Sequence, residues 1–107
     1  MPSARAYDAV VEGARAYFEV NVAFEADTDL SAIAQATDGE LLEDLIWDLD
    51  REFAMTTPKV VDAKGRSRVP QLLLPEHLTV TQLAEILDGG VWPESWILPG
   101  RFVWWRL

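Results

Sequence analysis

Residues 37–53 read T-D-G-E-L-L-E-D-L-I-W-D-L-D-R-E-F, and this stretch carries the apolar pattern that decides the fold. Its apolar residues recur at intervals of three and four, the spacing of one face of an α-helix: Leu41, Leu42, Leu45, Ile46, Leu49 and Phe53. Thr37 stands before this face and Glu40 follows three residues later, so the two predict a capping box that begins the helix at Thr37. The stretch therefore predicts an amphipathic helix with an acidic outer face.

Trp47 has two interpretations on this helix. At 100° per residue it lies almost opposite the apolar stripe, beside Glu43 and Asp44, which predicts an exposed side chain. An exposed tryptophan on an acidic face can anchor a protein partner, because aromatic residues are enriched at interface hot spots. In the alternative interpretation, the C-terminal tail folds over this face and covers the indole ring.

Two other segments also have helical spacing. Residues 80–87 follow Thr79, which has Gln82 at the capping-box position, and two glycines then end the segment. Residues 4–18 follow Ser3, a typical N-cap residue, and they carry one apolar stripe: Tyr7, Val10, Val11, Ala14, Tyr17 and Phe18. Both segments are therefore predicted to be helices that pack on the central one.

The remaining segments are expected to be extended. Residues 19–36 read as a loop with a single helical turn at 31–36, and three of their side chains are expected on the core: Val22, Phe24 and Leu30. Residues 56–70 contain turn residues and scattered charge, which predicts a loop or a short β ribbon that turns near Lys64-Gly65. The run V-P-Q-L-L-L-P at 69–75 reads as a short buried extended segment.

The tail, residues 91–107, holds four of the five tryptophans: Trp92, Trp96, Trp104 and Trp105. Pro99-Gly100 separates two apolar runs, which suits a type II turn that joins a hairpin. Four tryptophans left in water would form an unusually large apolar patch, so something must cover them. Either the tail packs across the helices of its own domain, or a partner or a second copy in a homodimer covers it.

Length and composition indicate one domain, residues 1–107. A chain of 107 residues is long enough to bury one core without metal or disulfide staples. It has no cysteine, so it has no disulfide, no thiolate metal site and no thiol nucleophile. Neither a signal peptide nor an apolar run long enough to cross a bilayer is visible. We therefore expect a cytoplasmic protein, either a monomer or a homodimer formed through the tail.

The net charge of −9 is concentrated in the first half of the chain. Residues 1–58 carry 3 basic and 13 acidic side chains, a net −10, whereas residues 59–68 carry 4 basic and 1 acidic, a net +3. An acidic surface repels phosphate backbones and anionic lipid, so neither nucleic acid nor a membrane is an expected partner. The basic segment is either a phosphate-binding patch or a solvated loop that reduces acidic self-repulsion: Lys59, Lys64, Arg66 and Arg68.

Four features resemble the acyl carrier protein family in their order and spacing. They are the helix at 4–18, the loop with F-E-A-D-T-D-L, the helix E-L-L-E-D-L-I-W-D-L-D-R-E-F and the later L-T-V-T-Q-L-A-E-I-L. The D-G-E sequence at 38–40 and the ending L-T-V-T-Q-L-A-E-I-L-D-G-G-V-W are similar to small bacterial carrier-like proteins of uncharacterised function. The resemblance implies a mainly α fold, an acyl-carrier-like bundle of three to four helices with a small β ribbon or hairpin in the C-terminal half.

In acyl carriers, an Asp-Ser-Leu motif at the start of the second helix supplies the serine that holds the phosphopantetheine arm. The acidic face of that helix docks on basic patches of partner enzymes. Here the motif maps onto Asp38, Gly39 and Glu40, so the resemblance implies no attachment serine, because glycine has no side-chain atom to esterify. It also implies a partner-binding face made of Asp38, Gly39, Glu40, Glu43, Asp44 and Trp47. Ser31 is the nearest serine, and a carrier modified there is a further alternative.

No residue pattern predicts catalysis, a metal site or a cofactor, and we expect no enzyme. His77 is the only histidine, and in L-P-E-H-L-T it precedes a helix start, where a helix-flanking role is expected in place of a general base. Asp44, Asp48 and Arg51 have helical spacing and read as a solvated face with one ion pair. The glycine pair at 89–90 is a helix stop, which differs from a phosphate-binding loop.

The sequence leads to three functional hypotheses. The first is a non-catalytic, carrier-like interaction module that docks its acidic second helix on a basic protein. The second is an acidic inhibitor of the immunity or antitoxin type, which blocks a basic protein by electrostatic complementarity. The third is an acyl or peptidyl carrier that is modified at an unconventional serine.

Overall fold

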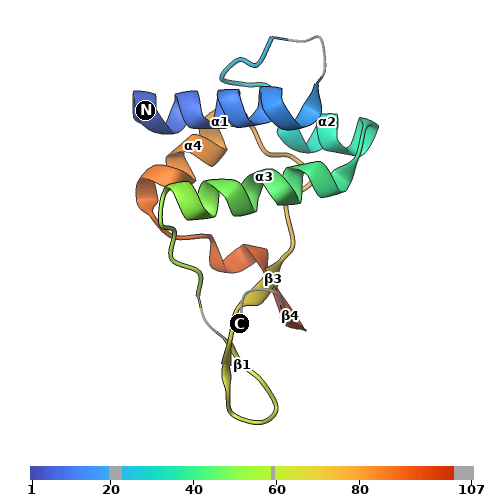
Figure 1. The fold of residues 1–107 in the computed structure, drawn as a ribbon, viewed down its shortest axis with the longest axis vertical. Coiled ribbons are helices and arrows are strands. Elements are labelled where there is room, and N and C mark those ends of the chain that lie inside the picture. Colours follow the sequence, from blue (N-terminus) through green and yellow to red (C-terminus); the bar gives the residue numbers. More distant parts are fainter. Residues whose placement is uncertain (20–22, 59, 103–107) are drawn as a thin grey trace.

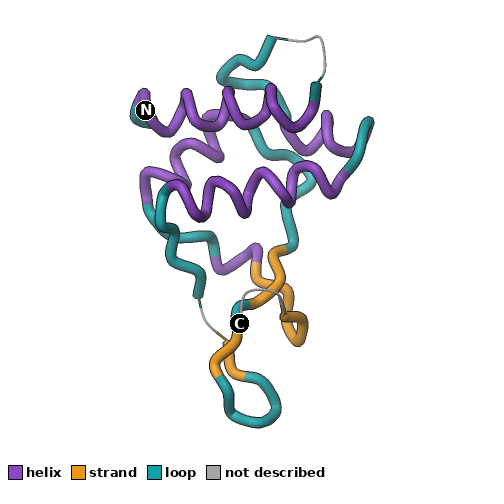
Figure 2. Tube along the Cα trace, in the orientation of Figure 1, coloured by secondary structure: helices purple, strands orange, loops and turns teal. Residues whose placement is uncertain are grey.

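The computed structural model describes residues 1–19, 23–58 and 60–102. Within these residues, helices form the body of the molecule and short strands extend from one end of it (Figure 1, Figure 2). The helices are α1 (Ala4–Phe18), α2 (Leu30–Ala36), α3 (Gly39–Glu52), α4 (Val80–Gly89) and the 3-10 helix η1 (Glu94–Trp96). The strands are β1 (Val60–Val61), β2 (Ser67–Arg68), β3 (Pro70–Leu72) and β4 (Ile97–Phe102). The predicted mainly α class with a small antiparallel β part is confirmed.

The core lies between the helices. Helix α1 packs on both α3 and α4, and α2 packs on α3. Gly13 allows α1 and α3 to approach closely, because a Cβ atom at this position would collide with Leu45 Cδ1. The buried residues of the predicted apolar stripes are Val10, Val11, Ala14 and Phe18 on α1, and Leu42, Leu45, Ile46 and Leu49 on α3. Removing these side chains from water is the main stabilising contribution to the fold.

Side-chain caps begin the helices, and one of them differs from the prediction. Ser3 and Thr79 cap α1 and α4 as predicted, and the capping box of α4 is complete. The prediction that Thr37 caps α3 is wrong. The N-cap is Asp38, whose carboxylate accepts a hydrogen bond from the backbone N–H two residues on, at 3.0 Å. Thr37 instead ends α2, where its hydroxyl donates to the Ile33 carbonyl at 2.8 Å, so only the next residue is left to begin α3.

Strands β1 and β2 form the predicted ribbon. They pair Val60 with Arg68 and Val61 with Ser67 in antiparallel fashion. The turn between them contains Gly65 at φ +77°, in the left-handed region that favours glycine. Figure 1 shows this ribbon extending away from the helices.

Residues 97–102, which include Pro99-Gly100, form the strand β4, and this strand pairs antiparallel with β3. The predicted hairpin about Pro99-Gly100 falls largely on residues 103–107, which lie outside the described residues. Strands β3 and β4 are paired at two positions: Pro70 with Phe102, and Leu72 with Ile97. Two steps along β3 therefore face five along β4, and the extra residues bulge. Gly100 lies among these extra residues at φ +74°, in the left-handed region that favours glycine.

The prediction that Trp47 is exposed is wrong. Its side chain is 7% exposed and belongs to the core. Asp50, three residues on, is 3% exposed, and its carboxylate accepts a hydrogen bond from the indole N–H of Trp92 at 2.8 Å. Side chains three residues apart lie on the same side of a helix, so the segment after α4 is hydrogen-bonded to the side of α3 that carries Trp47. The prediction assumed that α3 packs only through its apolar stripe, whereas in the structure the side that carries Trp47 is buried as well.

Trp92 and Trp96 both belong to the core of their own chain. They are 1% and 6% exposed, and their rings stack with centroids 5.6 Å apart. The backbone N–H of Trp92 donates to the Thr56 carbonyl at 2.9 Å, so the segments that follow α3 and α4 run side by side. Four residues that carried predictions lie outside the described part of the chain: Val22, Lys59, Trp104 and Trp105.

We expect the substitution Trp92→Phe to lower the free energy of unfolding by about 1–3 kcal/mol, because the buried Asp50 loses its indole donor. Urea unfolding followed by far-UV circular dichroism measures the change. Trp96→Phe is the matched control, since it removes the same ring volume from the stacked pair and leaves this hydrogen bond intact. Equal losses in the two variants would show that the hydrogen bond contributes nothing beyond ring burial.

Candidate functional site

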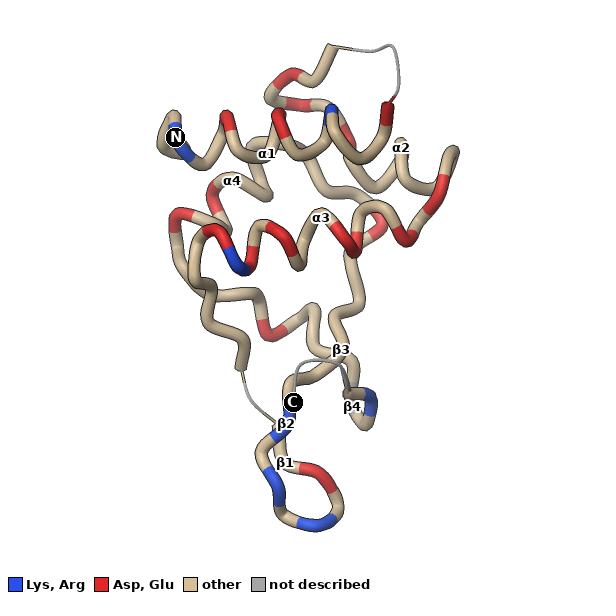
Figure 3. Tube along the Cα trace, viewed as in Figure 1, with Lys and Arg blue, Asp and Glu red and all other residues tan. Residues whose placement is uncertain are grey.

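The candidate binding surface is the outer side of the first two turns of α3. Four carboxylates lie there, and we call them the acidic edge: Asp38, Glu40, Glu43 and Asp44. Three are exposed, and Glu43 is half-buried. Among the described residues, no Lys or Arg forms an ion pair with any of the four. Figure 3 shows acidic residues along α1 and α3, while basic residues gather on the β ribbon. The acidic edge therefore presents negative charge directly to solvent.

The ion pair that the sequence predicts on this helix lies farther along it. Arg51 pairs with Asp48, and the Tyr17 hydroxyl donates to the same carboxylate. Asp48 is thereby tied to α1 and to its own helix. It is not part of the acidic edge.

Gly39 begins α3 within the acidic edge. Its position is exposed, and a Cβ atom there would meet no other atom within 4 Å. The backbone therefore leaves room for a side chain, serine included. Gly39 therefore lacks the hydroxyl group to which a phosphopantetheine arm could be attached, although the surrounding structure has space for a serine side chain.

Ser31 is poorly placed to replace the missing serine. Its side chain is 3% exposed, and its hydroxyl donates to the Pro75 carbonyl at 2.8 Å. A hydroxyl that carries a large group must reach solvent and the modifying enzyme. This placement counts against a carrier that is modified at Ser31.

Trp47 is the one predicted partner-binding residue that the structure removes from the surface. It belongs to the buried core. The other five lie together on the exposed start of α3: Asp38, Gly39, Glu40, Glu43 and Asp44. The candidate surface is therefore polar and has no aromatic anchor of its own.

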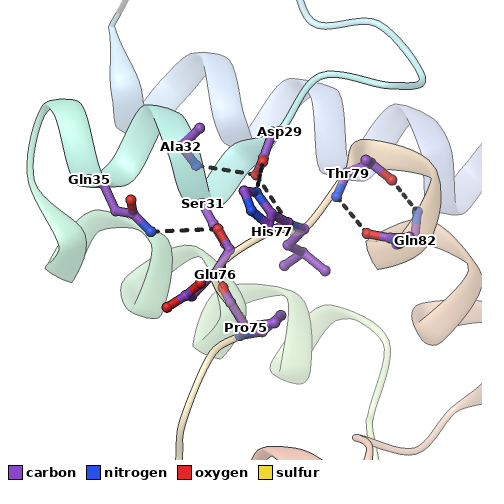
Figure 4. A network of polar contacts seen from close by, with 10 residues as sticks. Asp29, Ser31, Ala32, Gln35, Pro75, Glu76, His77, Thr79 and Gln82 are labelled. Carbon is purple, nitrogen blue, oxygen red and sulfur yellow. Dashed lines mark hydrogen bonds and ion pairs between the residues drawn. The ribbon is translucent and has the colours of Figure 1, made fainter.

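A second polar cluster joins the start of α2 to the segment before α4 (Figure 4). Asp29 caps α2, and its carboxylate accepts hydrogen bonds from the backbone N–H groups of Ala32 at 3.2 Å and Leu78 at 3.1 Å. His77 Nδ1 lies 2.7 Å from the other carboxylate oxygen. Two more hydrogen bonds from α2 reach the carbonyls of residues 75 and 76. Residues 75–78 are thus held firmly against α2.

Asp29 also changes the titration of His77. The hydrogen bond to the Asp29 carboxylate, followed by its charge, raises the pKa of His77. Burial raises the pKa of Asp29, but the hydrogen bonds from His77, Leu78 and Ala32 outweigh this effect, so the pKa of Asp29 is lowered. The imidazole is 81% exposed and stands next to a helix start, the helix-flanking position that the sequence predicts.

The basic side chains of the ribbon are largely paired within the ribbon itself. Arg66 Nε lies 3.1 Å and an Arg68 guanidinium nitrogen 3.8 Å from the Asp62 carboxylate. The backbone N–H groups of Arg66 and Lys64 also donate to Asp62, and the bond from Arg66 is the largest cause that lowers the pKa of this carboxyl. This pairing favours a solvated loop over a phosphate-binding patch.

The described segments contain no group of three His, Asp or Glu side chains that could hold a metal ion. None of the described helices has the length and apolar character needed to cross a membrane. Comparisons with protein-family models, with curated proteins and with solved structures find no match to this chain. The resemblance to acyl carriers therefore depends on the motifs and their order.

Sequence reasoning missed the two polar pairs Asp29–His77 and Asp50–Trp92. Asp29 directly precedes α2 and is a typical N-cap residue, so this part of the signal is present in the sequence. The partners, however, lie 48 and 42 residues away along the chain. No local pattern indicates contacts of that separation.

We expect the stability of the protein to fall as the pH rises through the folded-state pKa of His77. A raised folded-state pKa contributes stability that is full below the unfolded value of 6.5 and is lost above the folded value. NMR titration of the His77 ring should give a midpoint above 6.5 in the wild type and a lower midpoint in Asp29→Asn, which keeps an N-cap residue. The same midpoint in both proteins would show that Asp29 is not the cause.

Proposed function

We propose that the protein is a non-catalytic, carrier-like interaction module that docks the acidic edge of α3 on a basic surface of a partner protein. The observation that supports this most directly is the set of four carboxylates on two helical turns without an ion pair to any described Lys or Arg. Uncompensated charge of one sign destabilises a compact protein through self-repulsion. A basic partner relieves that repulsion when it binds.

The charge of the surrounding residues adds to that of the acidic edge. Residues 1–58 carry a net −10, and they form α1, α2 and α3. Such a field steers a basic protein toward the surface, and salt screens it over a distance of about 10 Å at 0.1 M. Complementary charge increases the association rate and selects the partner more than it raises affinity. This is suited to docking that is reversible and sensitive to salt.

The same proposal leaves out the attachment chemistry of carriers. Gly39 supplies no hydroxyl. Ser31 is buried, and its hydroxyl donates a hydrogen bond to the Pro75 carbonyl. We therefore propose a cytoplasmic protein that uses a carrier-like docking surface without a phosphopantetheine arm.

Neutralising the acidic edge should strongly weaken partner binding and leave the fold intact. The variant Glu40→Gln/Glu43→Gln/Asp44→Asn keeps Asp38, which caps α3. The tagged wild type is isolated from its native cell at low and at raised salt, and the recovered partner is then purified and titrated. We expect a basic protein that is lost at raised salt and that binds the variant at least about tenfold more weakly.

Glu12→Gln/Glu25→Gln/Asp27→Asn is the charge-matched control, because it removes three exposed carboxylates that lie outside the acidic edge. It should bind nearly as tightly as the wild type. Equal losses in the two variants would mean that only total charge matters, and unchanged affinity in the folded acidic-edge variant would rule the proposal out. A basic nuclease as the partner would favour an inhibitor of the immunity or antitoxin type, and acyl-chain enzymes would favour a carrier-like docking role.

If α3 is carrier-like, attachment should be recoverable in the variant Gly39→Ser/Glu40→Leu, which recreates the Asp-Ser-Leu motif after Asp38. The open space at Gly39 accepts the serine. After incubation with a phosphopantetheinyl transferase and coenzyme A, intact-mass spectrometry should show the added arm on this variant and none on the wild type. A folded variant that stays unmodified would argue against the resemblance, while a modified wild type would support the hypothesis of an unconventional serine.

A further inference from the structure

We propose that the partner presents an extended basic segment whose apolar side chains enter two neighbouring hollows, both lined by Pro75. The two hollows together are called the Pro75 groove. This inference depends on the proposed docking of the acidic edge, which begins beside the groove at Gly39. It adds the apolar contact that Trp47, being buried, does not supply.

The smaller hollow lies between α2, the start of α3 and the segment before α4. Its volume is about 140 Å³. Its apolar lining comes from Ala34, Leu42, Leu74 and Pro75, and Gly39 stands at its edge without a side chain. An apolar cavity of about this size can hold a benzene ring. The smaller hollow therefore accepts one apolar side chain.

The larger hollow lies against α4. Its volume is about 450 Å³, and its apolar lining comes from Pro75, Leu78, Ile86 and Trp96. Since Pro75 lines both hollows, they are neighbours. The larger hollow has room for an aromatic side chain or for a longer aliphatic one.

Hydrogen bonds fix the segment that contains Pro75 and lines both hollows. The Pro75 carbonyl accepts from the Ser31 hydroxyl at 2.8 Å, and the Leu78 carbonyl accepts from the Leu30 backbone N–H at 2.8 Å. Asp29 holds the same segment through His77, as Figure 4 shows. A surface that is ordered before binding loses little conformational entropy on binding. The Pro75 groove is therefore pre-organised for binding.

Charge complementarity indicates that the occupant is basic. Neither hollow is lined by Lys or Arg among the described residues, whereas Glu85 lines the larger one. Asp38 and Glu40 flank the residue at the edge of the smaller hollow, Glu76 follows Pro75, and all three are exposed. An apolar floor with carboxylates around it selects apolar side chains that alternate with basic ones.

An extended segment fits this arrangement. In an extended chain, the side chains of residues i and i+2 point to the same face about 7 Å apart, so they can enter two neighbouring hollows. The residues between them point away from the floor, where long basic side chains can reach the carboxylates of the rim.

The test uses two synthetic peptides of equal charge, K-L-K-L-K-L-K and K-S-K-S-K-S-K, titrated into the full-length protein at low ionic strength. We expect the leucine peptide to bind at least about tenfold more tightly than the serine peptide. Two-dimensional ¹⁵N–¹H NMR should place its largest shifts at residues of the Pro75 groove, such as Leu42, Leu74 and Ile86.

Two pairs of variants distinguish binding in the Pro75 groove from non-specific binding elsewhere on the protein. Gly39→Leu places a side chain at the smaller hollow, and Gly89→Leu is its control, because a Cβ atom meets nothing within 4 Å at either glycine. Ile86→Ser removes a wall of the larger hollow, and Val61→Ser is its control on the ribbon, where the side chain is 68% exposed. We expect the groove variants to weaken binding of the leucine peptide about tenfold, with no change for the serine peptide or in the controls.

Equal affinity for the two peptides, no detectable binding of the leucine peptide, or shifts confined to other surfaces would overturn the groove. If the acidic-edge variant weakens both peptides equally and the peptides do not differ in the wild type, the groove fails while docking of the acidic edge stands. If the leucine peptide is preferred and the acidic-edge variant binds both peptides as tightly as the wild type, the groove stands and docking of the acidic edge fails.

Discussion

The buried hydrogen bond between Asp50 and Trp92 is the contact on which the C-terminal half of the structure depends. A buried carboxyl group without a donor is costly, and so is a buried indole N–H without an acceptor. Each group therefore holds the other in one position. This contact places the segment after α4 on α3, and that segment continues through η1 into β4, which pairs with β3.

The same contact decides which surface of α3 is left for a partner. Helices α1 and α2 pack on α3, the segment that contains Trp92 is hydrogen-bonded to Asp50 of the same helix, and Trp47 is buried in the core. What stays in solvent is the acidic edge at the start of the helix. The apolar surface next to it comes from a different part of the chain, residues 74–78, which hydrogen bonds to Asp29 and Ser31 hold in place. Charge and apolar contact thus come from neighbouring elements.

Local patterns predicted most of the helical part and little of the C-terminal part. Helix α1 has the predicted bounds, and Ser3 and Thr79 are the predicted caps. Thr37 and Asp38 are neighbours between α2 and α3, and both are typical N-cap residues. The local pattern favours Thr37 as the cap of α3, but Thr37 ends α2 and Asp38 caps α3. The pairing of β4 with β3, which is far away in the sequence, is not indicated by the Pro99-Gly100 turn motif. A motif of two residues does not indicate which strand will pair with the residues beside it.

The sequence by itself determined helices α1, α3 and α4, the caps of α1 and α4, the ribbon turn and the acidic character of the outer edge of α3. These depend on periodicity, on residues a few positions apart and on charge, all of which are local. Only the tertiary structure decided that Trp47 is buried, that Asp29 meets His77 and that two hollows form around Pro75. Each of these depends on which distant segment covers a given side of a helix, and that is selected by packing and hydrogen bonding across the whole chain.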